Sequence, residues 1–533
     1  MLIRETLWLK ANARIDGREE LVQKLNLTLK DSPSDDELIL HAYETWGEDC
    51  INHLIGDFAF AIWDGRSHRL FCARDHFGVK PFFYTHISDH FNFSSSLNAL
   101  RLDGHVSDTL NEIAIGDYLL FGVNQDHSTT IFKDIQRLPP GHTLTVANNT
   151  VKIRRYWSPS IPAQVRYRDS DSYVERFSEL FSRAVADRLR SDRVAISMSG
   201  GLDSTSLAAI AREHGATVNA FSVVYDHLIP DQERHYSNVA AKHLGITITH
   251  VNADRYSLFD GAMDQPEPFL ISPLTGQFND LLRLCSEFSP VALTGYDGDA
   301  LMHEPQPSRF RIRTRIKRML RKQDDYDLLP AWIDDSFATQ TNLRERWKQF
   351  WSNPIPTRNR PAAMRALNSK IWTALFEGYD PASTKLDLEV SHPFLDLRLV
   401  EYLLAIPVKP WCVHKHILRS AMNGKLPPAV LNRQKTGLGG DPALQLARHA
   451  SVRWLDSFEV SPQLRAFVNL NRRRSVADEQ TSDGLWASLR VFALNYWLTN
   501  SRPARVRSRT QVNKALDDLN RLDCLKMETM HGT

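Results

Sequence analysis

The spacing of hydrophobic residues divides the chain into two parts that predict different kinds of structure. In the first part, to about residue 157, short apolar runs at 54–63, 69–73, 79–84 and 90–94 are separated by turn residues. Short runs bounded by Gly, Asp and Pro are typical of β-strands. The pattern therefore predicts a β-rich domain with short helices between its strands.

From about residue 170 the apolar residues take a helical spacing that alternates with continuous apolar runs. Residues 172–190 predict a helix, and residues 194–198 predict a strand that is buried on both faces. The alternation continues with a helix at 204–214, a strand at 218–225, a helix at 233–244 and a strand at 246–251. Strands that alternate with helices form a parallel sheet covered on both faces.

The rest of the chain is mostly helical after about residue 305 and ends in a predicted helix at 485–498. The sequence thus predicts an α/β protein with a first domain at 1–157, a second at 170–505 and a polar tail at 506–533. A chain of 533 residues is too long for a single compact core, which agrees with this division.

Composition narrows the class of protein. Hydrophobic residues make up 42% and charged residues 24% of the chain, as in ordinary soluble proteins, and the net charge is only +2. The five cysteines lack the paired spacing of disulfide frameworks and zinc sites, and Cys50 and Cys72 are expected to be core residues. Neither a signal peptide nor an apolar run of about 20 residues is found. We therefore expect a cytoplasmic protein that binds neither nucleic acid nor membranes.

A glycine turn lies between the predicted strand at 194–198 and the next helix, at the sheet edge where parallel sheets bind ligands. It reads Ser199, Gly200, Gly201, Leu202, Asp203, Ser204 and Thr205. Glycines let the backbone approach an anion closely, and the N–H groups that begin a helix favour phosphate oxygens. The hydroxyl groups add donors, and Asp203 is a candidate ligand of Mg²⁺. Two glycines alone are more often a tight turn, but the full string after a buried strand predicts phosphate binding without the spacing of a Walker A loop.

The full string resembles the pyrophosphate-binding loop of the ATP-pyrophosphatases, which cleave ATP between its α and β phosphates. Over roughly residues 10–500 the chain resembles the asparagine synthetase superfamily of that group, which implies a Rossmann-like parallel sheet in the second domain. Residues 294–299 are similar to the second signature of these synthetases. This similarity implies that Asp299 joins Asp203 on Mg²⁺ and that Gly295 lines the ATP site.

Residues 392–401, 415–422 and 433–437 resemble further motifs of the superfamily, in the family order. They imply that Lys415 belongs to the ATP site and that Lys435 lies beside the phosphates and the developing negative charge. Taken singly, such residues are as readily interpreted as surface charges or helix caps. Their common order favours the ATP- and Mg²⁺-dependent site.

Residues 13–18, 56–60, 74–81 and 138–141 resemble the class II glutamine amidotransferase domain, which implies an αββα fold for the first domain. Glutaminases of this class use an N-terminal cysteine whose own amine serves as the base. Position 2 of this chain is leucine. We therefore expect a degenerate domain without glutaminase activity, unless the start of the chain is mis-assigned.

Without an internal source of ammonia, the attacking amine is expected to belong to the substrate. Two branches of the superfamily work in this way, the β-lactam synthetases and the cyclases that close the isopeptide ring of lasso peptides. Tyr296 stands where asparagine synthetases have glutamate and β-lactam synthetases have tyrosine, which implies that it helps to deprotonate the amine. A phenol alone is a poor base, so Glu377 is our candidate for the carboxylate that assists it. The alternative interpretation of Tyr296 is a packed core tyrosine.

Residues 376–381, 410–412 and 435–442 look most like lasso-peptide cyclases. The resemblance implies a ligase that activates an Asp or Glu side chain as an acyl-adenylate, joins it to the peptide's N-terminal amine, and releases AMP and pyrophosphate. Its partners would be a precursor peptide and, in the same pathway, a leader peptidase and a leader-binding protein. The alternatives are a β-lactam synthetase, an asparagine synthetase fed by free ammonia, and an inactive scaffold that senses ATP.

The most basic stretch of the chain lies at 309–318 and continues to Lys322. It is a candidate docking site for an acidic leader peptide, a partner protein or RNA. A solvated helix face or a loop is the simpler interpretation, and no aromatic RNA-binding pattern accompanies the stretch.

Overall fold

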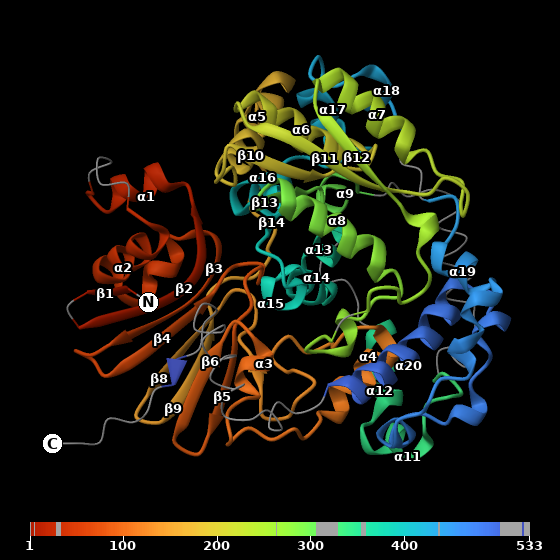
Figure 1. Ribbon diagram of the computed structural model, residues 1–533. Coiled ribbons are helices and arrows are strands. Elements are labelled where there is room, and N and C mark those ends of the chain that lie inside the picture. The colour runs from red at the N-terminus through yellow and green to blue at the C-terminus, as the bar shows by residue number, and fades with distance from the viewer. Residues whose placement is uncertain are drawn as a thin grey trace.

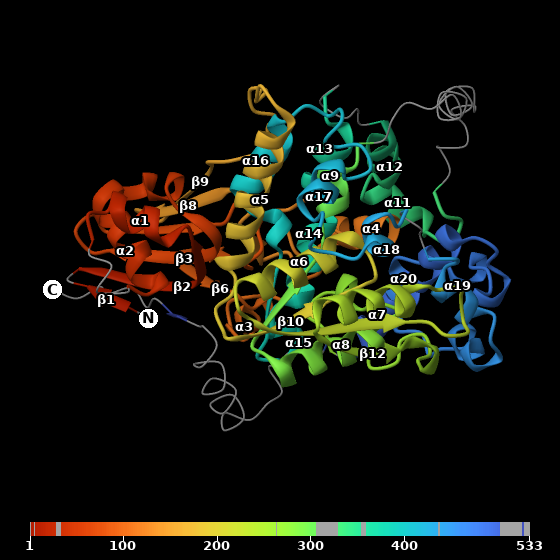
Figure 2. The ribbon, with the colours of Figure 1, turned by 90° about the horizontal axis from the view of Figure 1, so that it is seen from above.

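The computed structural model describes residues 2–4, 6–27, 33–262, 264–304, 329–352, 359–434, 438–501 and 525–526. The N-terminal strands lie at one side of the molecule, and a second sheet with its helices lies beside them (Figure 1). Seen from above, helices α19 (Pro442–Ala447) and α20 (Ser482–Asn500) occupy the end that is farthest from the first strands (Figure 2). No helix in these ranges is long and apolar enough to cross a membrane. The basic stretch at 309–318 falls outside them.

The N-terminal part contains two antiparallel sheets packed face to face. The larger sheet has the strand order β1 (Leu2–Arg4), β2 (Leu7–Asp16), β3 (Ile55–Asp64), β4 (Arg69–Arg74), β8 (His142–Ala147), β9 (Thr150–Arg155). The smaller sheet has the order β15 (Leu525–Lys526), β6 (His90–Ser94), β5 (Phe83–Ile87), β7 (Gln136–Arg137). Helices α1 (Arg18–Lys24) and α2 (Asp35–Trp46) cover the outer face of the larger sheet.

Alternation along β3 explains this layering. Phe58, Phe60 and Ile62 are buried in a core shared with α1 and α2. Ala59 and Ala61, between them, are buried against the smaller sheet. Successive side chains of a strand point to opposite faces of its sheet, so β3 supplies both cores. The layered arrangement is the one that the resemblance predicts for the first domain.

The second sheet is parallel, with the order β12 (Thr247–Asn252), β11 (Thr217–Val224), β10 (Arg193–Ser197), β13 (Val291–Thr294), β14 (Glu389–Ser391). The helices packed on it include α5 (Ser170–Ala186), α6 (Leu202–Glu213), α7 (Glu233–Leu244) and α8 (Thr275–Phe288). Val194 and Ile196 of β10 pack in one core with α5, α6 and α7, whereas Ala195 packs on the other face with α8. The prediction of an α/β fold whose parallel sheet is covered on both faces is therefore confirmed.

Most predicted elements are present with bounds close to those expected, but the strand predicted at 79–84 is wrong for its first four residues. Strand β5 begins only at Phe83. The carboxylate of Asp75 accepts the backbone N–H groups of Val79 and Lys80, each at 3.0 Å, and the following proline has no N–H to give to a ladder. These residues therefore form a loop around Asp75 and not a strand.

The four cysteines within the described ranges are free and buried. Burial raises the pKa of Cys50 to about 12 and that of Cys72 well above its usual value. A thiol that stays protonated is a poor nucleophile. The prediction that these two cysteines are core residues is confirmed, whereas Cys524 lies outside the described residues.

A buried cluster of charges joins β14 of the parallel sheet to the first domain. Arg14 of β2 contacts Asp16 at 2.9 Å, Asp57 at 2.7 Å and Glu389 at 3.3 Å. Lys80 also reaches Glu389, at 3.4 Å. Burial alone would raise the pKa of Glu389, but Lys80 and Arg14 lower it to about 2. The carboxylate therefore stays charged and bound to both cations at neutral pH.

An apolar core is also shared between distant parts of the chain. Helix α4 (Glu112–Phe121) packs in one buried cluster with α12 (Leu343–Ser352) and α20. Gly116 permits the close approach, because a Cβ at this position would lie 2.4 Å from Cδ2 of Leu343. The two domains are thus joined by continuous packing as well as by charges.

Candidate active site

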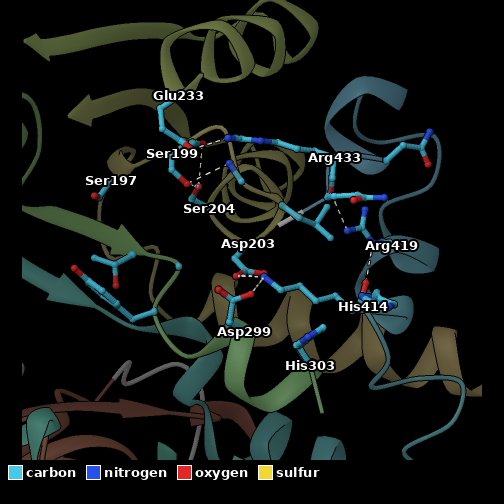
Figure 3. Close-up of a pocket in the computed structure, with 18 residues that line it drawn as sticks. Ser197, Ser199, Asp203, Ser204, Glu233, Asp299, His303, His414, Arg419 and Arg433 are labelled. Atoms are coloured by element: carbon cyan, nitrogen blue, oxygen red, sulfur yellow. Dashed lines mark hydrogen bonds and ion pairs between the residues drawn. The ribbon is translucent and has the colours of Figure 1, made fainter. Parts of the chain in front are cut away.

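A cavity of about 890 Å³ opens at the carboxyl edge of the parallel sheet, where β10 and β13 end (Figure 3). Parallel strands end at the same edge, so the turn at 199–205 and the segment at 294–299 meet there. The structure brings nine of the predicted site residues together on the cavity wall: Ser199, Gly201, Leu202, Asp203, Ser204, Gly295, Tyr296, Asp299 and Lys415. Lys435 lies outside the described residues, and its predicted role stays a prediction.

The glycine turn has a shape that only glycine permits. A Cβ on Gly200 would lie 2.3 Å from Cβ of Tyr236, and the Gly200 N–H donates to Glu233 at 2.5 Å. Gly201 is the N-cap of α6 and carries no capping side chain, so no side chain of its own covers the first N–H groups of the helix. The Thr205 hydroxyl donates to the Gly201 carbonyl at 2.8 Å, inside its own helix. The predicted phosphate donor Thr205 is therefore not brought to the cavity wall.

An arginine and a glutamate face the turn and are paired with each other. Arg433 donates to Glu233 at 2.8 Å, and its guanidinium lies 4.2 Å from the ring centroid of Tyr236. Its Nη1 atom is buried with no hydrogen-bond partner among the described residues. The hydroxyl oxygens of Ser199 and Ser204 lie 3.2 Å apart on the facing side. This arrangement fits an anion held between the turn and Arg433. The sequence pattern did not single out Glu233 or Arg433, although Arg433 begins the motif at 433–437.

The two predicted metal ligands are brought together by a lysine. The Lys415 ammonium lies 2.5 Å from a carboxylate oxygen of Asp203 and 2.5 Å from one of Asp299. A Cβ on Gly298 would lie 2.7 Å from Cγ of Asp203, so glycine is needed for this approach. The described residues contain no cluster of three or more side chains that would hold a metal alone. Two carboxylates fit Mg²⁺, which is usually bound by one or two of them together with water and substrate phosphates.

Tyr296 follows β13 and lies on the cavity wall with 38% of its surface exposed. The alternative interpretation of a packed core tyrosine is therefore wrong. Its hydroxyl oxygen accepts a hydrogen bond from Tyr379 at 3.1 Å. Burial, followed by the contact with Tyr296, raises the pKa of Tyr379 well above its usual value, so Tyr379 stays a donor.

Burial and nearby cations lower the pKa of His392 to about 3, and this neutral ring contacts the hydroxyl of Thr294 at 2.7 Å.

Glu377 does not join Tyr296, contrary to the prediction. It is buried in α14 (Ile371–Tyr379), and its two oxygens accept from Arg137 at 2.7 and 3.0 Å. Arg137 belongs to the first domain and also forms an ion pair with Glu267. The phenol of Tyr379, two residues further along the same helix, occupies the position expected for the carboxylate beside Tyr296.

The sequence pattern also did not single out Asp297, which lies between Tyr296 and the N-terminus of α9 (Gly298–Met302). Its backbone has φ 68°, a left-handed conformation that costs a non-glycine residue energy. Burial raises its pKa to about 7, and its Oδ2 atom has no hydrogen-bond partner in the described part of the chain. Such strain is common at functional sites, and no sequence pattern identifies it.

Comparison with known families agrees with this site. Residues 4–157 match the model of a glutamine amidotransferase domain, and residues 176–499 match that of asparagine synthase, which spans more than half of the chain. The chain belongs to the asparagine synthase family. The predicted superfamily is thus confirmed, and with it the chain is an asparagine synthetase-like, ATP-dependent ligase with an N-terminal amidotransferase domain. The lasso-peptide branch stays a prediction.

Several curated relatives are similar over most of the chain. Asparagine synthetase [glutamine-hydrolyzing] 3 of Bacillus subtilis is 30% identical over 442 residues, which cover 76% of this chain and 70% of that protein. Asparagine synthetase [glutamine-hydrolyzing] 2 of the same organism is 26% identical over 474 residues, or 80% of this chain and 61% of that protein. Among solved structures, the B. subtilis glutamine phosphoribosylpyrophosphate amidotransferase is 13% identical, with coverage of 46% and 71%. Its TM-score of 0.22 is too low for an argument.

Proposed function

We propose that this member of the asparagine synthase family is a macrolactam cyclase of the lasso-peptide type. The observation that carries the proposal is the phenol of Tyr296 on the cavity wall, backed by the hydroxyl of Tyr379 at 3.1 Å. A hydrogen bond donated to a phenol oxygen stabilises the phenolate, and the phenolate is the form that can receive a proton from an amine. The phosphate turn shares the cavity with this phenol, so activation and amide formation can follow in one place.

The proposed reaction has two steps. A carboxylate oxygen of the substrate's Asp or Glu forms a bond to the α-phosphorus of ATP, and the bond to pyrophosphate breaks. The N-terminal amine then forms a bond to the activated carbonyl carbon, and the bond from that carbon to the AMP oxygen breaks. The amine proton passes to the phenolate form of Tyr296, whose own proton has gone to solvent. The N–H groups at Gly201 and α6 and the side chain of Arg433 would bind the phosphates.

Asp203 and Asp299 would hold Mg²⁺ once Lys415 releases them. When bound, the ion neutralises phosphate charge. Lys435 would face the same phosphates from the motif at 433–437.

The test is incubation with candidate precursor peptides, ATP and Mg²⁺. We expect the peptide to lose one water by mass spectrometry, with one AMP released for each ring formed. Asp203→Asn should abolish ring formation, because it removes one of the two carboxylates from the ion site. Asp192→Asn is the matched control, since Asp192 is exposed immediately before β10, at the opposite edge of the sheet. Release of ADP, or full activity of the Asp203 variant, would contradict the proposal.

A second candidate is asparagine synthesis, which is favoured by the names of the relatives that are 30% and 26% identical. In that case aspartate, ATP and either ammonia or glutamine would give asparagine, and no precursor peptide would be cyclised. Closure of a β-lactam would appear in the same assay as loss of water from a small amino acid substrate and not from a peptide. The proposed partners are a precursor peptide, a leader peptidase and a leader-binding protein, with activity in the cytoplasm.

A further inference from the structure

Helix α14 connects the first domain to Tyr296 on the cavity wall, through the hydroxyl of Tyr379 behind it. Near its start, Thr373 contacts a ring nitrogen of His127 through its hydroxyl at 3.0 Å. One turn later, Glu377 receives two hydrogen bonds from Arg137, at 2.7 and 3.0 Å. The helix ends at Tyr379, which donates to Tyr296. One nine-residue helix is therefore held by the first domain and delivers a side chain to the active site.

The contact at Arg137 is a buried charge cluster with a fixed geometry. Side-chain exposure is 1% for Arg137, 5% for Glu377 and 2% for Glu267, the second carboxylate on the same guanidinium. Buried charges are costly unless they are paired, and a planar guanidinium binds carboxylates in defined directions. The cluster consequently holds the rotation of α14 much more tightly than a solvent-exposed ion pair would.

The rotation of α14 decides which side chain faces Tyr296. Residues two apart on a helix point in different directions. With Glu377 turned to Arg137, Tyr379 is turned to Tyr296. If Glu377 were released, α14 could rotate or shift, and the phenol of Tyr379 would lose its alignment with Tyr296.

We propose that Arg137 is a positioning residue of the synthetase site: by binding Glu377 it fixes α14 and keeps the hydroxyl of Tyr379 on the phenol of Tyr296. The amidotransferase-like domain thereby serves the amide-forming step as a support for the active site. The link to the reaction rests on the proposed function, in which Tyr296 receives the amine proton. The link from Arg137 to the tyrosine pair does not depend on it.

The first test is a crystal structure of the Glu377→Gln variant beside that of the wild type. The glutamine has no charge and only one acceptor oxygen, so the two-bond contact with Arg137 that fixes the rotation of α14 is broken. Glu267 keeps the guanidinium paired, so this change is milder than removal of the arginine. We expect the two phenol oxygens to separate beyond hydrogen-bond distance, about 3.5 Å, in the variant only. An unchanged tyrosine pair in the variant would overturn the proposal, whatever reaction the enzyme catalyses.

The second test separates the two chemical steps. In Glu377→Gln we expect the rate of amide formation to fall about tenfold, while ATP–pyrophosphate exchange, which reports adenylate formation, stays within about twofold. Tyr379→Phe should give the same split. The double variant should be no slower than the slower single variant, because both changes break one connection. Multiplicative losses in the double variant, or an equal loss of exchange, would refute the positioning role.

Two further variants provide a control and a substitute for Glu377→Gln. Lys80→Met is the matched control, because it removes a different contact between the domains, Lys80 with Glu389 at 3.4 Å, and does not touch α14. It should leave both rates unchanged. If Glu377→Gln does not fold, Thr373→Val removes only the neutral contact at the start of α14 and should show a smaller split of the same kind. If the wild type exchanges pyrophosphate but forms no ring, the proposed function fails while the crystallographic comparison still decides the positioning role.

Discussion

Replacement of Lys415 by methionine should make the protein depend on Mg²⁺ for stability. The ammonium now neutralises Asp203 and Asp299, whose oxygens each lie 2.5 Å from it. Those two oxygens are therefore no more than about 5 Å apart, a distance at which two charges repel by about 3 kcal/mol at an effective dielectric constant of ~20. Because the Asp299 side chain is 41% exposed, solvent screening lowers the expected loss to about 1 to 2 kcal/mol.

The assay is thermal unfolding of wild type and Lys415→Met in EDTA and in increasing Mg²⁺. In EDTA the variant should unfold about 1 to 2 °C below the wild type, and Mg²⁺ should recover most of that difference. The double variant with Asp203→Asn should lose the response to Mg²⁺, because a single carboxylate remains. If Lys415→Met responds to EDTA and Mg²⁺ no more than the wild type, the two carboxylates do not form an ion site.

Three other changes test separate parts of the structure. Gly200→Ala should reduce ATP–pyrophosphate exchange at least about a hundredfold, because its Cβ has no room beside Tyr236; Gly104→Ala, where nothing lies within 4 Å, should be neutral in the same assay. The free energy of unfolding of the wild type should fall by about 2 kcal/mol more than that of Glu389→Gln as the pH drops from 4.5 toward 2. The pKa of Glu389 is lower in the folded chain than in the unfolded chain, so the charged carboxylate stabilises the fold above the unfolded pKa, and this stabilisation is lost on protonation. Equal acid sensitivity of the two proteins in denaturant titrations would rule this out. Asp297→Gly should raise the free energy of unfolding by about 1 kcal/mol, because it relieves the left-handed backbone, and a loss of stability in urea would contradict the assignment of strain there.

The sequence predicted the parts of this site that depend on local chain geometry. The turn around Gly200 follows an apolar run that predicts a buried strand, and parallel sheets bind ligands at the edge where such strands end. The pairing of Asp203 with Asp299 was expected from the resemblance alone, and the contact of both with Lys415 was not predicted. The fold class followed from the same alternation of strands and helices.

What the sequence could not reveal were neighbours separated by long stretches of chain. Glu377 is 240 residues from Arg137, and the sequence pattern around α14 does not show that this carboxylate binds a buried arginine. Which residue of α14 faces Tyr296 depends on this contact between the domains. The short strand β13 was missed for a different reason, since its four residues are too few to show a period.

The core that α4 shares with α12 and α20 has a consequence for how the chain is made. All seven residues at 114–120 are buried, so α4 is covered on every side and is stable only inside that core. On the ribosome α4 emerges long before α20 is synthesised. The side chains of α4 that α20 will cover therefore stay exposed until then, unless a chaperone binds them. A fragment that stops after the first domain would leave this helix exposed and aggregation-prone. The two domains are best regarded as one folding unit, to be expressed together.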